Sequence, residues 1–248
     1  MTPEAERFNA AQHHYRCITD GEYFFSVTAG VPASNTDAPT SLILSYNGVH
    51  VGELVKMTST NGITTLAGNF LLMCRRADLV TVDLYTGQVE PGPDASTRLE
   101  RSLITFTAFH YRQSQGRSMA WSVYRESNWT ASTNRIDPFT FEQTERLVGV
   151  QWSANEVTIP RSGNYYVYLS GKTQPNAALG LTIRRNGVDV FGVYREATAG
   201  VETLSHGAVL LLTAGDKLKV VAEPNTAGFS RRVSPSLRQT SFFGFFII

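Results

Sequence analysis

Cysteine is scarce in this chain, which has only two, Cys17 and Cys74, among 248 residues. Two thiols are too few for a disulfide scaffold or for a four-cysteine zinc site. Long apolar runs are also missing. A membrane-spanning helix needs about 20 mostly apolar residues, and the apolar C-terminal stretch, residues 241–248, is far shorter. The sequence therefore predicts no disulfide scaffold, no structural zinc and no membrane span.

A strong charge of one sign is missing too. The net charge at pH 7 is +1, whereas a nucleic-acid-binding domain is usually strongly basic. The sequence also contains none of the motifs H-E-x-x-H, G-x-S-x-G, the Walker loop and G-x-G-x-x-G, which mark metalloproteases, serine hydrolases, NTPases and dinucleotide enzymes. We therefore expect no nucleic-acid partner, no catalytic residues, no metal site and no cofactor, and a protein that is not an enzyme.

What the chain does have is β-structure almost throughout. Short runs rich in Val, Ile, Tyr, Phe and Thr, such as "GEYFFSV" and "KLKVVAE", are separated by clusters of Gly, Asn, Asp and Pro. That pattern is typical of strands joined by turns. Beyond the first dozen residues, no segment sustains the 3.6-residue apolar period of a helix. The predicted fold class is all-β.

The second half of the chain repeats the first. Four pairs of similar segments keep their order, at offsets that drift only from 142 to 136 residues. Such drift is expected from loop-length differences between two copies of one fold. We therefore predict two domains, residues 1–113 and 119–248, joined by a polar linker at 114–118. The paired segments are 21–27 with 163–169, 42–51 with 179–190, 70–84 with 208–222, and 102–111 with the C-terminal stretch, where Phe106 and Phe109 stand opposite Phe242 and Phe245.

The first copy lacks an opening strand. Residues 119–125, "MAWSVYR", alternate like a strand at the front of the second copy, and their counterpart would fall before Met1. Without that strand, a neighbouring strand would expose unpaired backbone groups. Three explanations remain open: native sequence upstream of Met1, a substitute strand from the linker, or a strand lent by another chain.

The motifs of both copies resemble the globular head of complement C1q, within the C1q and tumour necrosis factor superfamily. The second copy contains, in order, "AWSVYR", "NEVTIPRSGNYYVYLSG", "HGAVLLLTAGDKLKVV" and "TSFFGFFII". These are similar to the family's first strand, its G-x-F-x-x-P-x-x-G-x-Y-x-F segment, its L-x-x-G-D-x-V hairpin and its closing F-x-G-F strand. The first copy carries "HHYRCITDGEYFFSV", "GNFLLMCRRADLVTVDL" and "LITFTAFHY" in the same order. The resemblance implies two tandem jelly-roll β-sandwiches, each built from two antiparallel sheets, the first without its opening strand.

The resemblance also implies a compact homotrimer. Strands such as "GNYYVYL" and "FFGFFII" carry bulky residues at both alternating sets of positions, as expected for strands that are covered on both faces. On this interpretation the C-terminal stretch is the last strand of the second domain and lies centrally in its sheet. Gly244 would permit a close approach where a side chain would not fit.

The first copy is the more diverged, and neither copy offers a good calcium site. Ile18, Ala77 and Ala108 stand where the second copy has proline or glycine. Some family members bind calcium through acidic residues beside one strand, and a hard cation needs several oxygen ligands. We do not expect calcium here, because the matched positions provide few such ligands: Ala177 and Asn186 in the second copy, Thr40 and Asn47 in the first.

Four arginines are candidates for binding an anionic ligand: Arg184, Arg185, Arg231 and Arg232. A guanidinium group makes two-point contacts with carboxylate, sulfate or phosphate. The alternative is that these arginines are solvated on loops and strand edges. Asn128 begins the sequon Asn-Trp-Thr, a candidate for N-glycosylation, which together with the resemblance favours the secretory pathway. No apolar signal-peptide core is visible at the start of this chain.

The two cysteines can be interpreted in two ways. In the resembled fold, the strands near Cys17 and Cys74 approach each other at one end of the sandwich, which would allow an intradomain disulfide. Their counterparts in the second copy, Ile159 and Leu212, are both apolar. The paired replacement fits a disulfide, and it fits two buried free thiols equally well.

The leading functional hypothesis is a secreted, non-enzymatic recognition protein. Its trimeric C1q-like heads would bind an external glycan, microbial or protein surface through loops, in the manner of a lectin of innate immunity, with avidity strengthening each weak contact. Two alternatives remain. One is a self-assembling component of an extracellular matrix, capsule or adhesive, and the other is a receptor ligand like tumour necrosis factor or a synaptic organiser.

Overall fold

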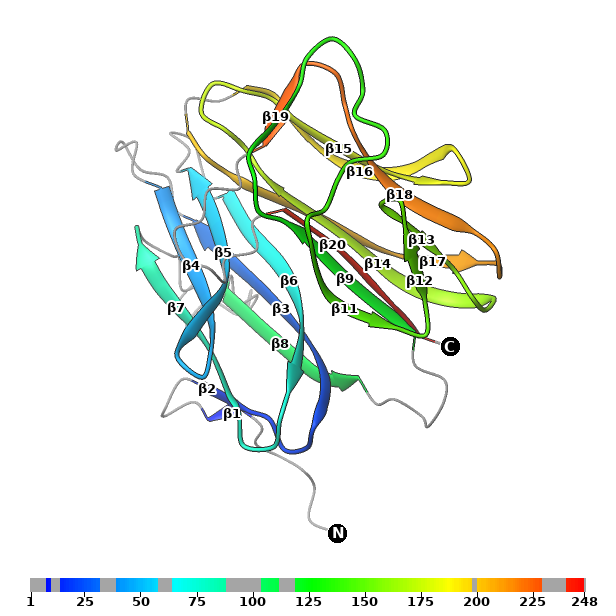
Figure 1. The fold of residues 1–248 in the computed structure, drawn as a ribbon. Helices are drawn as coiled ribbons and strands as arrows, with labels where there is room; N and C mark the ends of the chain where they lie inside the picture. Colours follow the sequence, from blue (N-terminus) through cyan, green and yellow to red (C-terminus); the bar gives the residue numbers. More distant parts are fainter. Residues whose placement is uncertain are drawn as a thin grey trace, which may run out of the picture. The chain divides into compact units, whose positions relative to one another are not determined.

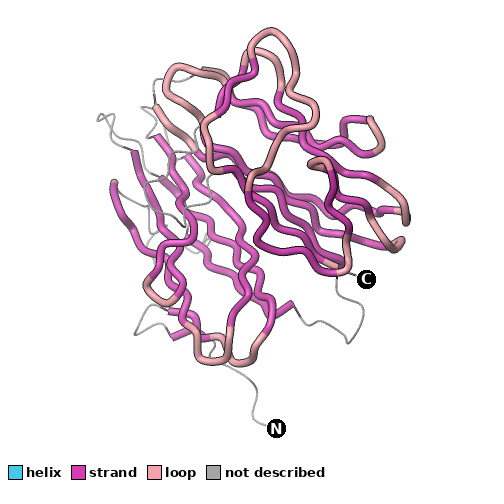
Figure 2. Tube along the Cα trace, in the orientation of Figure 1, coloured by secondary structure: helices cyan, strands magenta, loops and turns pink. Residues whose placement is uncertain are grey.

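The computed structural model of the chain describes residues 8–9, 14–31, 39–57, 64–87, 104–111, 119–197, 200–228 and 240–247. These residues form strands, turns and loops, with no helix among them (Figure 2). It follows that this part of the chain has no helix that is long and apolar enough to cross a membrane. The all-β class predicted from the strand-like runs is confirmed.

The strands fall into two compact units (Figure 1). Unit 1 contains β1–β8 and unit 2 contains β9–β20. β8 ends at Tyr111 and β9 begins at Ala120. The linker predicted at residues 114–118 lies outside the described residues.

Unit 1 consists of two antiparallel sheets, with strand orders β1-β2-β7-β4-β5 and β6-β3-β8. The longest strand, β3, lies in the middle of the second sheet and pairs with both β6 and β8. The strands are β1 Phe8–Asn9, β2 His14–Arg16, β3 Gly21–Val31, β4 Pro39–Tyr46, β5 Val49–Met57, β6 Thr64–Cys74, β7 Leu79–Thr86 and β8 Ile104–Tyr111.

Unit 2 consists of two five-stranded antiparallel sheets, with strand orders β11-β9-β20-β14-β17 and β12-β13-β18-β15-β16. A short ribbon of β10 and β19 is added to them. The strands are β9 Ala120–Arg125, β10 Trp129–Ala131, β11 Gln143–Val148, β12 Gln151–Ser153, β13 Glu156–Thr158, β14 Gly163–Lys172, β15 Leu179–Arg185, β16 Val188–Arg195, β17 Thr203–Leu212, β18 Lys217–Ala222, β19 Thr226–Gly228 and β20 Thr240–Phe246. Ten strands in two packed antiparallel sheets form a jelly roll.

The two units share one strand order, except at a single place. The sheet β1-β2-β7-β4-β5 corresponds to β12-β13-β18-β15-β16, and β6-β3-β8 corresponds to β17-β14-β20. Beyond β20, unit 2 continues with β9 and β11. Beyond β8, the described part of unit 1 has no such strands. Within its described residues, unit 1 therefore has no counterpart of the opening strand β9.

The pairing register agrees residue by residue with the alignment of the two copies. Gly21 pairs with Cys74, and Gly163 pairs with Leu212 at the equivalent place. The same holds for the closing strands, where Val27 faces Phe106 and Leu169 faces Phe242. A shift of one residue would turn every side chain to the opposite face, so these matches show that corresponding residues face the same way in the two units.

Each unit is built around its own apolar core, formed between its two sheets. In unit 2 the core joins side chains of one sheet, including Trp121 and Phe242, to side chains of the other, including Leu181 and Val220. Unit 1 has a corresponding core between its own two sheets. Tyr15 lies edge-on to Phe25 there, with ring centroids 5.5 Å apart.

The C-terminal strand β20 is central in its sheet, as predicted. It pairs with β14 on one side and with β9 on the other. A Cβ atom added at Gly244 would lie 2.4 Å from the indole carbons of Trp121 and 2.8 Å from the carbonyl oxygen of Tyr166. No side chain fits there without displacing the indole or the neighbouring strand, which confirms the expected close approach at Gly244.

Candidate functional site

A hydrogen-bonded turn joins β6 to β7 in unit 1. The backbone N–H of Asp78 donates to the carbonyl oxygen of Arg75 at 3.1 Å, and the N–H of Arg75 donates to Oδ2 of Asp78 at 2.6 Å. Asn47, from the turn between β4 and β5, donates through Nδ2 to Oδ1 of Asp78 at 2.9 Å. Its own Oδ1 accepts from the N–H of Leu79 at 2.9 Å. One aspartate and one asparagine therefore hold two neighbouring turns together.

Unit 2 repeats this arrangement between β17 and β18. The N–H of Thr213 donates to Oδ2 of Asp216 at 2.6 Å, Asn186 donates to Oδ1 of Asp216 at 2.7 Å, and the N–H of Lys217 donates to Oδ1 of Asn186 at 2.9 Å. Burial acts to raise the pKa of Asp216, but these hydrogen bonds and the Arg185 guanidinium outweigh it and leave the pKa below its ordinary value. The ionised carboxylate is therefore part of the folded turn.

Arg185, one of the predicted ligand-binding residues, contacts this turn. Its NH2 lies 2.6 Å from Oδ2 of Asp216, and its NH1 donates to the carbonyl oxygen of Leu211 at 3.1 Å. In unit 1 the equivalent position is Tyr46, whose hydroxyl donates to Oδ2 of Asp78. Burial and the hydrogen bond to Asp78 raise the pKa of Tyr46 well above its usual value. Arg185 thus holds the turn of unit 2 where a neutral tyrosine holds that of unit 1.

Arg184, the neighbouring candidate, belongs to a network of alternating charges on β15, β16 and β18. Its NH1 lies 2.9 Å from Oδ2 of Asp137, and its Nε lies 2.8 Å from Oδ1 of Asp189. Nζ of Lys219 forms a second ion pair with Asp137, 2.5 Å from its Oδ1. Burial acts to raise the pKa of Asp137, but Lys219 and Arg184 outweigh it and keep the pKa low.

The same network extends to Arg135, whose Nε lies 2.8 Å from Oε2 of Glu223 and whose NH2 lies 3.3 Å from Asp189. The charges of Arg184 and Arg185 are therefore compensated within unit 2, so a bound anion would compete with these carboxylates. The other two predicted arginines, Arg231 and Arg232, lie outside the described residues. Ligand binding by the four arginines stays a prediction.

Cys17 and Cys74 meet in the core of unit 1, and both are fully buried. The N–H of Cys17 donates to the carbonyl oxygen of Asp78 at 2.9 Å, and Cys17 accepts from the N–H of Ala77 at 2.7 Å. A hydrogen bond to Cys17 and burial raise the pKa of the Cys74 thiol far above its usual value. In this structure both side chains are free thiols. The disulfide between these neighbours stays a prediction.

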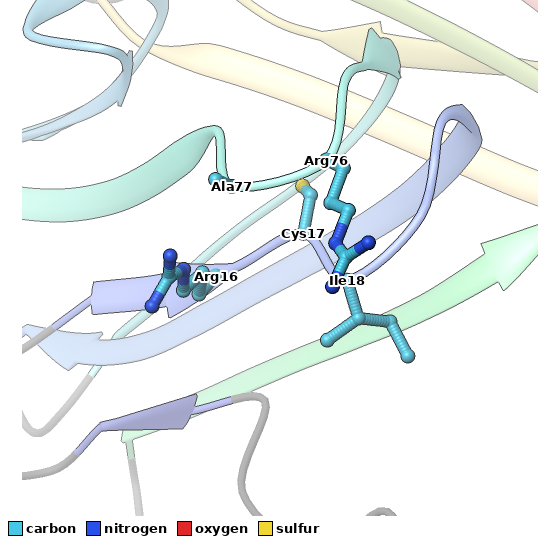
Figure 3. A pocket seen from close by; sticks show the side chains of 5 residues that line it. All are labelled: Arg16, Cys17, Ile18, Arg76 and Ala77. Atoms are coloured by element: carbon cyan, nitrogen blue, oxygen red, sulfur yellow. The ribbon is translucent and has the colours of Figure 1, made fainter.

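A pocket of about 260 Å³ opens beside Cys17. It is lined by Arg16 at the end of β2, by Cys17 and Ile18 after it, and by Arg76 and Ala77 of the facing turn (Figure 3). The figure shows the side chains of Arg16 and Arg76 on either side of the Cys17 backbone. The pocket therefore brings two cations together at the surface of unit 1.

Sequence reasoning missed both of these arginines. Arg16 and Arg76 are 60 residues apart in the chain, and neither belongs to a recognised motif. A signal was present in the internal alignment, where they stand opposite Thr158 and Ala214. A charge that occurs in one copy only is not needed for the shared fold. That comparison would have singled out both arginines.

Asn128 and Trp129 differ in exposure. Asn128, the predicted glycosylation acceptor, is exposed. The adjacent Trp129 is 4% exposed and packs edge-on against Phe139, with ring centroids 5.0 Å apart. Trp129 is therefore a packing residue in the core of unit 2 and not an exposed ligand contact.

No cluster of three or more His, Cys, Asp or Glu side chains suited to a metal ion occurs within the ranges that the structure describes. Asn47 and Asn186, two positions matched to the family's calcium site, are engaged with Asp78 and Asp216. Their side chains connect turns in both units. The arrangement of these residues thus offers a structural role in place of cation binding.

The sheet that contains β14 and β20 carries aromatic side chains on both faces. Tyr165 and Phe242 point into the core. Because neighbouring residues of a strand point to opposite faces, Tyr166, Tyr168 and Phe243 point away from it. The rings of Tyr168 and Phe243 lie 4.7 Å apart, and those of Tyr166 and Phe243 lie 6.3 Å apart. With Phe245, 5.4 Å from Tyr166, they form an aromatic cluster on the outer face.

Comparison with known proteins gives a structural likeness and no match by sequence. No model of a protein family matches the chain, and no curated protein matches it by sequence. Among solved structures, the globular domain of zebrafish complement 1qA protein is similar, with a TM-score of 0.40 and 20% sequence identity, over 52% of this chain and 97% of that domain. The strand order and pairing of the two units, rather than this likeness, define their fold.

Proposed function

We propose that the chain is a secreted, non-enzymatic recognition protein with two C1q-like heads in tandem. In this proposal it assembles as a homotrimer and presents its loops to a glycan or protein surface outside the cell. The two units with one strand order and matching register support the tandem arrangement. The sequon at the exposed Asn128 is consistent with passage through the secretory pathway.

Exposed apolar side chains of β17 are the observation that carries the proposed assembly: Val209 is 59% and Leu211 is 70% exposed, whereas Tyr168, Phe243 and Phe245 of the aromatic cluster are buried within the chain. Large apolar patches on a sheet face mark a surface that another protein covers. Identical faces of three chains around a threefold axis would cover one another in a closed assembly. Three chains would then present six heads, and weak loop contacts to a repetitive surface would gain strength from avidity.

Sedimentation equilibrium or light scattering tests the assembly. We expect a mass three times the chain mass of 27.3 kDa. Leu211→Asp should dissociate the trimer because it places a charge in the apolar interface, whereas Val190→Asp, at a 40% exposed position on β16, should not. Circular dichroism of both variants verifies that they remain folded. A wild-type monomer would overturn the trimer.

Target binding requires its own experiment. We expect the folded trimer to bind selected members of a glycan array or a microbial surface, and the monomeric Leu211→Asp variant to bind them much more weakly. Equal binding by trimer and monomer would contradict the role of avidity. A folded trimer that binds none of the targets and forms larger particles as its concentration rises would instead favour the structural alternative.

A further inference from the structure

Arg16 and Arg76 differ from five described arginines of unit 2 in making no ion pair. Arg125, Arg135, Arg184, Arg185 and Arg195 all make ion pairs with carboxylates of the same unit. Within the residues that the structure describes, the guanidinium groups of Arg16 and Arg76 make none. Both side chains are exposed, and both line the same pocket (Figure 3).

Two carboxylates of this end of unit 1, those of Asp20 and Asp78, hydrogen-bond to the backbone of the turn and make no ion pair with Arg16 or Arg76 in the described part of the chain. Oδ1 of Asp20 accepts a hydrogen bond from the backbone N–H of Arg76 at 2.6 Å. Asp78 accepts from the N–H of Arg75 at 2.6 Å and from Asn47 at 2.9 Å. These bonds fix the turn that carries Arg76, and none of the described residues that line the pocket is acidic.

The shape of the pocket favours a small group. Its volume of about 260 Å³ lies below the range of roughly 300–1,000 Å³ that is usual for sites of drug-sized ligands. It is nevertheless several times the roughly 30 Å³ that one water molecule occupies in the liquid. Ile18 and Ala77 add apolar lining to the pocket. The space therefore suits one compact anionic group and some surrounding solvent.

Unit 2 shows that the fold does not require these arginines. The backbone bonds at Cys17 recur at Ile159, whose N–H donates to Asp216 at 2.8 Å and whose carbonyl accepts from Gly215 at 2.7 Å. At this matching place Thr158 replaces Arg16 and Ala214 replaces Arg76. The same turn thus forms without either charge, so the arginines of unit 1 are available for another role.

We propose that the pocket of Arg16 and Arg76 binds a sulfate or phosphate group. Guanidinium donors bind the oxygens of such groups through charge-assisted hydrogen bonds, often two at a time. A tetrahedral oxyanion has enough oxygens to accept from both arginines at once. Binding would remove the repulsion between two uncompensated cations. The group can be a free inorganic ion or an ester on a polymer, because the shared chemistry is the oxyanion itself.

Titration of the full-length protein followed by NMR tests the site. The probes are sodium sulfate, sodium phosphate and, at equal ionic strength, sodium chloride. We expect sulfate or phosphate to shift the backbone amide signals of Cys17, Ile18 and Ala77 in a saturable way, and chloride to leave them unchanged. Equal shifts with all three salts would overturn the proposal, since they would report ionic strength alone.

Two variants locate the binding and separate it from general electrostatics. Arg16→Gln combined with Arg76→Gln should weaken oxyanion binding at least tenfold. Arg75→Gln is the matched control, because Arg75 is an exposed arginine next to Arg76 that does not line the pocket; it should change the affinity less than twofold. Equal losses in the two variants would contradict a defined site.

A transplant keeps the test independent of losses through misfolding. Thr158→Arg combined with Ala214→Arg places the two guanidinium groups at the matching turn of unit 2, and we expect a second set of saturable shifts around Ile159 and Gly215. Dextran sulfate, dextran phosphate and neutral dextran then distinguish polymer-borne esters from free ions. If inorganic ions bind and neither charged dextran does, the pocket takes free ions only.

The trimer proposal and the pocket proposal can be contradicted independently of each other. The described residues that line the pocket all belong to unit 1, so the Leu211→Asp variant of unit 2 should keep wild-type oxyanion shifts whether or not it is monomeric. Loss of the shifts in that variant would show that binding requires the assembly. Wild-type shifts in a protein that never forms a trimer would leave the pocket proposal intact and reject only the assembly.

Discussion

Asn186 donates a hydrogen bond from Nδ2 to Oδ1 of Asp216 at 2.7 Å, and Asn47 makes the same bond to Asp78 at 2.9 Å in the other unit. Each pair joins the turn of a hairpin, β15–β16 or β4–β5, to the turn that connects the two sheets of its unit, between β17 and β18 or between β6 and β7. The pair is kept in both units although many residues around it differ. It therefore anchors the end of the sandwich on which the anion pocket of unit 1 is built.

Replacing Asp216 should destabilise unit 2. In Asp216→Ala the N–H of Thr213 and the Nδ2 of Asn186 lose their acceptor, and hydrogen bonds to a charged group contribute about 1.5–3 kcal/mol each. We expect unfolding in urea to require roughly 2–4 kcal/mol less free energy. All three tryptophans, Trp121, Trp129 and Trp152, lie in unit 2, so tryptophan fluorescence reports this unit selectively.

The contribution of Asp216 should also depend on pH. Because the folded-state pKa is lowered, the carboxylate stabilises the fold above the unfolded-state pKa of about 3.9, and this stability is lost as the pH falls through the folded-state value. Asp216→Asn should therefore lose less stability than wild type between pH 5 and pH 2. The exposed Asp83→Asn is the control. A steeper acid dependence in Asp216→Asn would contradict the assigned role.

Gly215 and Ala77 offer a reciprocal test of backbone strain. Both have positive φ, 91° and 77°, a region that disfavours residues with a Cβ by about 1–2 kcal/mol. A Cβ at Gly215 would meet no atom within 4 Å, so Gly215→Ala measures strain alone and should destabilise unit 2 by about 1 kcal/mol. Ala77→Gly should stabilise unit 1 by up to about 1 kcal/mol, less the entropy that glycine adds to the unfolded chain. If Ala77→Gly is less stable than the wild type, backbone strain at this position is contradicted.

The fold could be predicted from the sequence because its signals are repeated. Alternation in single strands gives the class, and two ordered sets of similar segments give the register, including the pairing of Phe106 and Phe242 with equivalent positions on β3 and β14. The missing opening strand followed from the same comparison. Short strands such as β10 and β19 were not predicted, because three residues are too few to show a period.

The sites were harder to predict, because a charge on a sequence does not show which partner the fold gives it. In the sequence, the guanidinium groups of Arg184 and Arg185 appeared available to bind a ligand. In the structure they form ion pairs with Asp137, Asp189 and Asp216. These carboxylates reach the arginines from other strands and turns. At the pocket, by contrast, the sequence did not indicate two charges that the fold leaves without an ion pair. Arg16 and Arg76 are 60 residues apart and line one pocket only because β2 lies beside the turn between β6 and β7.

The charge network around Arg184 should stabilise unit 2 modestly and depend on salt. Arg184→Gln removes two ion pairs, to Asp137 and Asp189, whose side chains are partly exposed. We expect a loss of about 1–2 kcal/mol at low ionic strength that shrinks in 1 M salt, where the screening length is about 3 Å. Lys217→Gln, which breaks one exposed pair with Glu156, should lose less than about 1 kcal/mol. Equal losses, unaffected by salt, would show that packing dominates.

Cys17 and Cys74 should form a disulfide when a mild oxidant such as oxidised glutathione is present, because the two side chains lie against each other in the core. They are 57 residues apart, and the chain-entropy model gives about 4 kcal/mol for a loop of that length. Free-thiol titration in denaturant, followed by urea unfolding with and without reductant, measures both effects. The variant with Cys17→Ile and Cys74→Leu, the residues of unit 2, is the redox-insensitive control. Two titratable thiols after oxidation would contradict the bond.

Replacing a phenylalanine of the closing strand by alanine should destabilise unit 2, whose closing strand is β20, more than unit 1, whose closing strand is β8. Phe242 is fully buried, with ring centroids 5.6 Å from Trp121 and 6.0 Å from Phe141, so Phe242→Ala should lower the free energy of unfolding by about 3–5 kcal/mol. Its counterpart Phe106 is only partly buried and stacks on Phe25 at 5.8 Å.

Phe106→Ala should therefore lower the stability of unit 1 by less than Phe242→Ala lowers that of unit 2. Tryptophan fluorescence follows the unfolding of unit 2, and reactivity of Cys17 and Cys74 toward a thiol reagent follows unit 1, since both cysteines are buried there. A change in each probe only for the variant of its own unit would show that the two jelly rolls unfold independently. If either substitution moves both probes together, β8 and β20 belong to one cooperative structure, because stability lost at one strand is then felt in the other unit.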